Sequence, residues 1–342
     1  MRAFPRCLTS ATFPALVLAC LLPGCGKKTD VAGTPSSAGP VKIGFLVKDP
    51  TEPWFQLEWR FADQAARDLG FTLVKIGATD GEKVLSAIDN LAAAGAQGFV
   101  ICTPDARLGP AIVARARAAH LKLLSIDDQF VGADGRPLAD VHYLSIPGTR
   151  IGEQAGQALA AELKRRAWPV AETALCAVTF DELDTCRQRT EGAIATLVAA
   201  GLSPERIFRV AERTTDVTGG FDAANTLIAR HPAVKYWLVC SVNDNSVLGA
   251  VRALEGAGFS EKNSLAVGIN GTDCIIELEK EKPTAFFGSI LLPAKIHGYQ
   301  SAAMMHKWIS EGVEPPRDTR TTGTLITREN FRLVLKEQGI RE

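Results

Sequence analysis

Four side chains that could bind a small molecule, Lys48, Glu52, Trp54 and Phe55, follow an apolar segment at residues 41–47 that is typical of a buried β-strand. In an open α/β sheet, ligands bind just outside the carboxyl ends of the strands, so we expect these side chains to face a cleft. Charged groups hydrogen-bond to hydroxyls, and aromatic rings pack against apolar C–H faces. The combination suits a small polyhydroxylated molecule such as a sugar.

The same arrangement recurs after later apolar segments of the chain. Polar side chains follow these segments at Asp127, Asp128, Thr185, Arg189, Asn243, Asn270 and Asp273. Each also has an ordinary structural interpretation, because Asp and Asn are common helix N-caps, an Arg can be a solvated helix residue, and a Trp-Phe pair can belong to the core. Their recurrence at strand ends in both halves of the chain favours one shared cleft, in which they would saturate the hydroxyls of a monosaccharide.

The elements that must position these residues alternate between short β-branched segments and longer amphipathic segments, which predicts an α/β fold with parallel sheets. The expected strands are residues 41–47, 71–77, 98–103, 121–127, 174–180, 206–212, 235–242, 264–270, 284–292 and 323–328. The expected helices lie near 56–69, 82–94, 109–119, 150–166, 186–200, 217–230, 245–257 and 293–311, with a last one at the C-terminus.

Because a single core rarely grows beyond about 250–300 residues, we expect two doubly wound parallel-sheet lobes. Breaks near Pro147, Pro293 and Gly323 indicate that the chain crosses between the lobes three times and forms a three-segment hinge. The predicted domains are an N-terminal lobe (41–147 plus 293–322) and a C-terminal lobe (148–292 plus 323–342).

The N-terminus predicts export. Residues 1–24 begin with Arg2 and Arg6 and continue with a short apolar run, which is typical of a signal peptide. The ending Leu22-Pro23-Gly24-Cys25 resembles the lipobox of bacterial lipoproteins, so we expect lipidation at Cys25, with residues 25–40 as a flexible tether. Cys20 is a weaker candidate, and an ordinary cleaved signal or an uncleaved anchor stays open. The expected location is the periplasm, tethered to a membrane.

Composition limits the partners. Lys plus Arg and Asp plus Glu number 38 each, so no excess of positive charge favours nucleic acid or an acidic membrane surface. Neither the five His residues nor the five Cys residues after Cys25 show metal-ligand spacing, and most of these thiols are expected to be buried. We therefore expect no metal and no cofactor.

Several motifs together resemble one family. The segments VKIGFLVKDPTEPWFQLEW, GFVICTPD, IDDQFV, DELDTCRQRT, VNDNSVLG, GINGTD, GSILLP and LITRENF are similar to the type I periplasmic sugar-binding proteins of ABC transporters, in particular their L-arabinose-binding branch. The similarity runs from about Val41 to the C-terminus. It implies a monomeric receptor that binds L-arabinose, or D-galactose or D-fucose, and delivers it to an ABC permease.

The resemblance also implies a set of sugar-contacting residues. These are Lys48, Glu52, Trp54, Phe55, Cys102, Asp127, Asp128, Thr185, Arg189, Asn243, Asn270 and Asp273. Asp128 stands where the family carboxylate meets the anomeric hydroxyl. Ile146 and Val242 stand where the family has methionines near the sugar, and the position of Ile146 bears on whether a hydroxymethyl group is tolerated. The ranking of arabinose, galactose and fucose therefore stays open.

Three other functions share features with this sequence. Asp127 and Asp128 could be a glycosidase pair, but adjacent residues in a turn need not face one bond at the ~5–10 Å separation that this chemistry uses, so we expect no catalysis. A sugar-responsive repressor would begin with a DNA-binding motif rather than an export signal. A lipoprotein that presents its sugar to a chemoreceptor or sensor kinase stays open as the alternative to transport.

Overall fold

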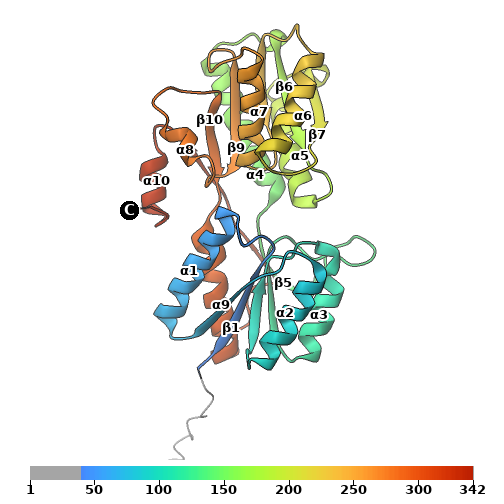
Figure 1. Cartoon of the computed structure of the whole chain (residues 1–342), viewed down its shortest axis with the longest axis vertical. Helices are drawn as coiled ribbons and strands as arrows, with labels where there is room; N and C mark the ends of the chain where they lie inside the picture. The colour runs from blue at the N-terminus through green and yellow to red at the C-terminus, as the bar shows by residue number, and fades with distance from the viewer. Residues whose placement is uncertain (1–39, 342) are drawn as a thin grey trace, which may run out of the picture. The chain divides into compact units, whose positions relative to one another are not determined.

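The computed structural model describes residues 40–341, so the predicted signal peptide, Cys25 and nearly all of the predicted tether lie outside the described residues. Within residues 40–341, no helix combines the length and the apolarity needed to cross a bilayer. The strands form two six-stranded sheets, β11-β5-β4-β3-β1-β2 and β12-β10-β9-β8-β6-β7. The predicted fold class, two doubly wound α/β lobes joined by a three-segment hinge, is confirmed (Figure 1).

The N-terminal lobe contains the first sheet, whose strands are all parallel. Its strands are β1 (Lys42–Val47), β2 (Thr72–Gly77), β3 (Gly98–Ile101), β4 (Lys122–Asp127), β5 (His142–Ser145) and β11 (Asp318–Arg320). Its helices are α1 (Pro53–Leu69), α2 (Gly81–Ala93), the 3-10 turn η1 (Ala106–Leu108), α3 (Gly109–Ala118), the π-helical turn η4 (Ile296–Gln300) and α9 (Ser301–Glu311). Helices α1 and α9 pack together, as do α2 and α3.

The pleat of β1 explains why both faces of this sheet are covered. Phe45 and Val47 belong to the apolar cluster that includes Phe61 of α1, whereas Leu46 belongs to the cluster that includes Leu91 of α2. Successive side chains of a strand point to opposite faces, so a continuously apolar strand requires helices on both sides. The carboxyl end of β1 is then one of the few places where the strand can expose polar residues.

The C-terminal lobe contains the second sheet, which is parallel except that β12 runs antiparallel to β10. Its strands are β6 (Thr173–Thr179), β7 (Ile207–Ala211), β8 (Tyr236–Cys240), β9 (Ser264–Asn270), β10 (Phe286–Leu291) and β12 (Thr324–Thr327). Its helices are α4 (Gly148–Arg165), η2 (Val170–Glu172), α5 (Asp184–Ala199), η3 (Pro204–Arg206), α6 (Val217–Arg230), α7 (Asp244–Gly256), α8 (Ile275–Glu279) and α10 (Phe331–Glu337).

Three crossing segments join the sheets: residues 146–147 between β5 and α4, 292–295 between β10 and η4, and 321–323 between β11 and β12. The predicted residue boundaries of the lobes stay a prediction. At the C-terminus the chain also returns to α1, where the Arg60 guanidinium donates hydrogen bonds to the carbonyls of Gly339 and Ile340, at 2.7 and 2.9 Å.

Two strands were not expected from the sequence. Both β5 and β11 are short; β11 is the edge strand of the first sheet and mostly exposed, and β5 lies between β11 and β4. The structure also begins several helices earlier than predicted: α1 begins at Pro53 and α7 at Asp244. Glu52 and Asn243 consequently occupy helix N-cap positions.

Close packing of α4 on α5 positions the helix that carries Thr185 and Arg189. A Cβ atom at Gly152 of α4 would lie 1.9 Å from the carbonyl oxygen of Arg189, and one at Gly192 of α5 would lie 2.3 Å from that of Thr149. Since real Cβ atoms do not approach backbone this closely, only glycine permits the spacing between the two helices.

We expect Gly152→Ala to lower the free energy of unfolding by about 3 kcal/mol, because the helices must separate to admit the methyl group. Gly256→Ala is the matched control, since a Cβ there meets nothing within 4 Å. That variant should leave stability unchanged or raise it by about 0.5–1 kcal/mol. Urea unfolding of both variants measures the difference, and equal stabilities would contradict the packing account.

A buried carboxyl joins α7 to the loop after β9 and to β10. Asp244 is fully buried and accepts hydrogen bonds from Gly271 N (2.9 Å), Cys274 N (3.3 Å) and Ser289 Oγ (2.6 Å). Burial raises its pKa to about 7. Between pH about 4 and 7 the folded chain therefore holds a proton that the unfolded chain releases, so this group's contribution to stability decreases as the pH rises through that window.

Between pH 5 and pH 7.5 the wild type should lose free energy of unfolding as Asp244 loses its proton. The Asp244→Asn variant should lose less over the same range, by an amount on the order of a few kcal/mol. The amide keeps an oxygen for the two backbone N–H groups and presents its NH₂ to the Ser289 hydroxyl, so the fold should be retained. Urea unfolding at both pH values tests this, and a loss as large as that of the wild type would show that Asp244 does not titrate in this window.

Candidate functional site

The polar residues singled out in the sequence gather at the carboxyl ends of strands, around one cleft of about 390 Å³ between the lobes. The turn after β1 supplies Lys48, the end of β4 supplies Asp127 and Asp128, and the end of β9 supplies Asn270. Helix α5 supplies Arg189. Parallel strands bring all these ends to the same edge of each sheet, and the two edges face each other.

Asp128 is held by both lobes. Its carboxylate pairs with Lys48 Nζ at 2.5 Å and accepts a hydrogen bond from Thr185 Oγ1 of the opposite lobe at 2.7 Å. The Cys102 thiol lies 3.7 Å from the same carboxylate. Burial alone would lower the pKa of Lys48, but Asp128 raises it well above its usual value, so Lys48 stays charged.

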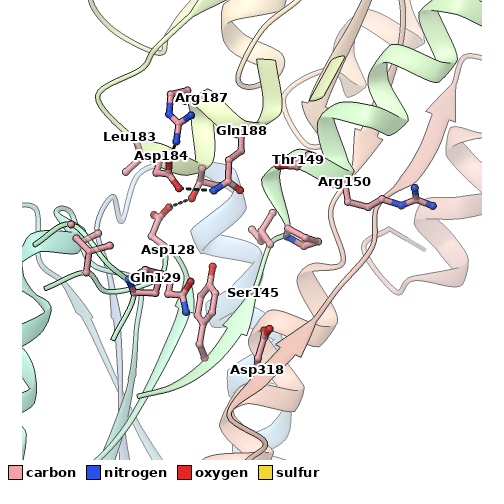
Figure 2. A pocket seen from close by; sticks show the side chains of 18 of the residues that line it. Asp128, Gln129, Ser145, Thr149, Arg150, Leu183, Asp184, Arg187, Gln188 and Asp318 are labelled. Atoms are coloured by element: carbon pink, nitrogen blue, oxygen red, sulfur yellow. Dashed lines mark hydrogen bonds and ion pairs between the residues drawn. The ribbon is translucent and has the colours of Figure 1, made fainter. Parts of the chain in front are cut away.

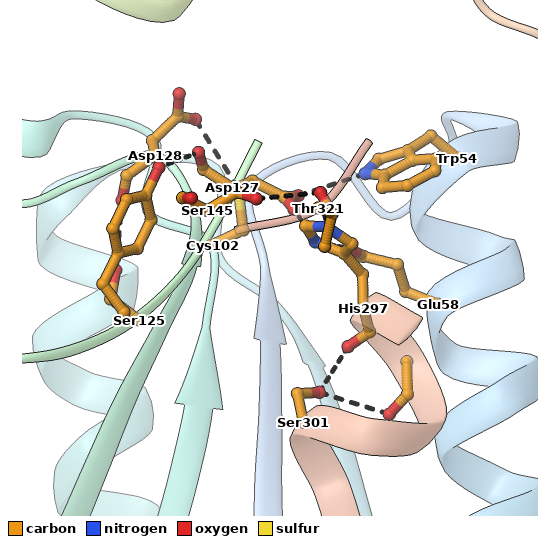
Figure 3. A network of polar contacts seen from close by, with 12 residues as sticks. Trp54, Glu58, Cys102, Ser125, Asp127, Asp128, Ser145, His297, Ser301 and Thr321 are labelled. Carbon is orange, nitrogen blue, oxygen red and sulfur yellow. Dashed lines mark hydrogen bonds and ion pairs between the residues drawn. The ribbon is translucent and has the colours of Figure 1, made fainter. Parts of the chain in front are cut away.

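Asp127 is held by hydrogen bonds from residues of the N-terminal lobe. Its carboxylate accepts hydrogen bonds from Trp54 Nε1 (3.1 Å) and from His297 Nδ1 (2.6 Å), and its carbonyl accepts one from Tyr143 Oη (2.6 Å) (Figure 3). Burial would raise the pKa of Asp127, but His297, Trp54 and Lys48 together lower it below its usual value, so the group is ionised. Its φ of 63° lies in the left-handed region, a strain that often marks functional sites.

The C-terminal lobe contributes a donor that has no acceptor within residues 40–341. Arg189 is buried, and its Nη1 donates to the Val242 carbonyl at 2.7 Å and lies 3.5 Å from Asn270 Oδ1. Arg189 Nε is buried without a hydrogen-bond partner among the described residues. A buried donor without a partner is costly, so this N–H can bind an oxygen that enters the cleft.

A second contact between the lobes involves Glu52 and Asn270. Asn270 Nδ2 donates to Glu52 Oε1 at 3.3 Å, and the backbone of Asn270 has a φ of 107°. Burial raises the pKa of Glu52 to about 7, although Lys48 opposes this shift. Asn243 lies nearby as the N-cap of α7, where its Oδ1 accepts from Ser246 N and its Nδ2 donates to Thr215 O, both at 2.8 Å.

Twelve of the fourteen predicted sugar-contacting residues line this cleft. They are Lys48, Glu52, Trp54, Phe55, Asp127, Asp128, Ile146, Thr185, Arg189, Val242, Asn243 and Asn270. The other two do not line it: Cys102 lies behind Asp128, and Asp273 is half-buried in the turn after β9, where it accepts a hydrogen bond from Thr272. The contact of these residues with a sugar stays a prediction.

The structure adds cleft residues that sequence reasoning did not identify: Pro104, Asp105, Arg107, Phe180, Glu182, Leu183, Cys186, Thr215 and Leu292. Most lie in loops, where no periodicity identifies the inward side chain. Glu58 and His297 were also missed. Glu58 lies one turn after Trp54 on the apolar face of α1. A charged residue on an otherwise apolar helix face is the sequence feature that could have identified it.

A wider groove of about 830 Å³ adjoins the cleft at Asp128, Ile146 and Thr185 and extends beside the crossing segments (Figure 2). Charged residues of both lobes line it, among them Arg150, Asp184, Arg187 and Asp318.

Glu58, Asp127 and His297 form a buried trio whose nearest side-chain atoms lie within 4.8 Å of one another. Such a set resembles a metal site, in contrast to the sequence, where the histidines showed no ligand spacing. The 2.6 Å between His297 Nδ1 and Asp127 Oδ1 is, however, a direct hydrogen-bond distance. We interpret His297 as a hydrogen-bonded support for Asp127, with Glu58 buried beside it.

Known proteins were compared with this chain. Residues 40–331 match the family described as periplasmic binding proteins and sugar binding domain of LacI family. The L-arabinose-binding periplasmic protein of Escherichia coli (strain K12) is 50% identical over 301 residues, which cover 88% of this chain and 92% of that protein. The ABC transporter L-arabinose-binding periplasmic protein of Azospirillum brasilense is 44% identical, over 98% of this chain and 99% of that protein.

Solved structures share the fold at lower identity. A carbohydrate transporter solute binding protein from Agrobacterium radiobacter, in complex with D-arabinose, aligns with a TM-score of 0.70 at 21% identity, over 89% of this chain and 100% of that chain. An ABC transporter periplasmic solute binding protein from Actinobacillus succinogenes with bound D-allose aligns with a TM-score of 0.73 at 17% identity, over 86% and 99%. The chain therefore belongs to the periplasmic binding protein family, in which its sequence groups with the bacterial L-arabinose-binding periplasmic proteins.

Proposed function

We propose that this protein is a periplasmic receptor that binds a monosaccharide, L-arabinose in the first place, in the cleft between its lobes. The observation that carries the proposal is Arg189 Nε, a buried cationic donor without a partner among the described residues, in a cleft that also presents Lys48, Asp128 and Asn270. A sugar hydroxyl is both donor and acceptor, so it can satisfy Arg189 and bind a carboxylate at the same time.

Cleft size and walls support a small sugar. The cleft of about 390 Å³ accommodates a monosaccharide together with ordered water. Trp54 and Phe55 provide flat apolar surface on the N-terminal side, and Ile146 and Val242 line other parts of the wall. Two relatives at 44–50% identity are named for L-arabinose binding, which supports arabinose over other monosaccharides. D-Galactose and D-fucose are the secondary candidates.

The function is non-catalytic in this proposal. Both carboxylates that could form a glycosidase pair already have partners: His297 and Trp54 hold Asp127, while Lys48 and Thr185 hold Asp128. A general acid needs a proton to donate, whereas the pKa of Asp127 is lowered. These contacts support a binding role.

The sugar would be delivered to an ABC permease, as the name of the Azospirillum relative suggests. Binding would stabilise the closed arrangement of the lobes, because the sugar reaches its partners in both lobes only when they approach. Lipidation of Cys25, supported by the motif Leu22-Pro23-Gly24-Cys25, would keep the receptor beside its membrane. Presentation to a chemoreceptor is the alternative, and neighbouring genes for a permease or for a sensor alone distinguish the two.

Calorimetric titration of the purified protein with L-arabinose, D-galactose, D-fucose, D-xylose, D-ribose and D-glucose tests the proposed ligand. We expect L-arabinose to bind most tightly, with D-galactose or D-fucose next. Absence of heat with all six sugars would reject the monosaccharide proposal.

Arg189→Ala should weaken L-arabinose binding by more than tenfold, because the sugar oxygen loses a charged donor and Asn270 loses its neighbour. Arg187→Ala is the matched control on the same helix. Arg187 is half exposed, pairs only with Asp184 among the described residues, and does not line the cleft. Its loss should change the affinity less than twofold. Equal affinities of the two variants would show that the sugar does not contact Arg189.

A further inference from the structure

Thr321, in the third crossing segment, is hydrogen-bonded to residues that flank the other two crossing segments. Thr321 begins the third crossing, and its backbone N–H and its hydroxyl both approach the carbonyl of Ser145, at 3.2 and 2.9 Å. Ser145 is the last residue before the first crossing. His297, just after the second crossing, places Nε2 at 3.2 Å from Thr321 Oγ1. All three residues are buried.

The same histidine ring contacts two residues that line the cleft, Asp127 and Trp54. His297 Nδ1 lies 2.6 Å from Asp127 Oδ1, and Asp127 Oδ2 accepts from Trp54 Nε1 at 3.1 Å. The rings of His297 and Trp54 also meet edge to face, with centroids 5.5 Å apart. Figure 3 shows the continuous chain from Trp54 through Asp127 and His297 to Thr321.

Hydrogen-bond partners fix the His297 ring at both of its nitrogens. Nδ1 is hydrogen-bonded to the Asp127 carboxylate, and Nε2 is hydrogen-bonded to Thr321 Oγ1, which also contacts the Ser145 carbonyl. The ring is therefore held in one orientation between Asp127 and Thr321.

A neutral Glu58 fits this arrangement. Its carboxyl lies 3.8 Å from His297 Nδ1, is fully buried, and has no hydrogen-bond partner among the described residues. Burial, and then Asp127, raise its pKa well above the usual range, although Lys48 lowers it. The charged groups facing the ring are therefore Asp127 and, beyond it, Lys48.

We propose that His297 is a positioning residue that couples the sugar cleft to the hinge, because its ring joins Asp127 and Trp54 on one side to Thr321 of the third crossing segment on the other. The inference rests on the proposed function for its ligand. Movement of the hinge shifts Thr321 and Ser145, and the rigid imidazole ring transmits the shift to Asp127 and Trp54. Asp127 and Trp54 thus have the positions needed for sugar binding in only one arrangement of the hinge.

Thr321→Val tests the coupling, since it keeps the shape of the side chain and removes the hydroxyl. Thr173→Val is the matched control: Thr173 is also fully buried and donates its hydroxyl to a backbone carbonyl, that of Pro169 at 2.8 Å, but it lies at the start of β6. Both variants should lose thermal stability. Only Thr321→Val should weaken L-arabinose binding, by about tenfold, and Thr321→Ser should restore it.

A double-mutant cycle separates coupling from general loosening. Trp54→Phe removes the N–H that binds Asp127, at the other end of the chain. If the hydrogen-bonded residues from Trp54 to Thr321 act as a unit, the loss of affinity in the double variant Trp54→Phe/Thr321→Val should be several-fold smaller than the product of the two single losses. Losses that multiply, or an equal affinity of Thr321→Val and Thr173→Val, would overturn the proposal.

Two readouts do not depend on the ligand. Nitrogen-15 NMR should show the ring signals of His297, assigned by their disappearance in His297→Gln, shifted in Thr321→Val and unchanged in Thr173→Val. Small-angle X-ray scattering of the ligand-free protein should show a broader distribution of lobe separations for Thr321→Val than for Thr173→Val. Unshifted His297 signals in Thr321→Val or identical scattering would reject the coupling, whereas failure of the wild type to bind any sugar would reject only the proposed function.

Discussion

Burial of charge in the cleft is the constraint on which the site depends. Lys48, Asp127, Asp128 and Arg189 lie where water is largely excluded, and a buried charge without a partner costs several kcal/mol. In the N-terminal lobe the buried charges have partners within the lobe, since Lys48 pairs with Asp128 and His297 pairs with Asp127. In the C-terminal lobe this holds only in part, because Arg189 Nε has no partner among the described residues. Arg189 Nε therefore needs a hydrogen-bond acceptor at the place where a ligand would enter.

That asymmetry links binding to closure. Asp128 already contacts Thr185, and Glu52 contacts Asn270, so polar groups join the lobes across the cleft. Polar contacts of this kind exchange readily with water or with sugar hydroxyls. A ligand that replaces them and also satisfies Arg189 binds the closed arrangement better than the open one, which is the condition for a population shift.

The sequence was sufficient for most of the architecture, because apolar strands and amphipathic helices alternate regularly. It was sufficient also for the residues that follow long buried strands, such as Asp128 after β4 and Asn270 after β9. It failed for β5 and β11, whose three or four residues are too few for a period to show. Glu58 and His297 could not be predicted as partners, since only folding brings α1 and η4 beside β4.

The cleft residues at the start of α5 show the same limit. Leu183 and Cys186 lie close to Thr185 in the sequence, yet nothing in their pattern distinguishes a side chain that lines the cleft from one that faces solvent. Cys102 was expected to line the cleft, but the turn of the chain after β3 places it behind Asp128. In each case the deciding factor is the direction of a side chain in a turn, which depends on backbone angles rather than on residue type.

A crystal structure of the protein with L-arabinose tests the central claim most directly. The account predicts a sugar oxygen within hydrogen-bonding distance of Arg189 Nε, with Asp128 bound to the same sugar from the opposite lobe. A sugar bound elsewhere, or an Arg189 Nε still without a partner in the complex, would contradict it.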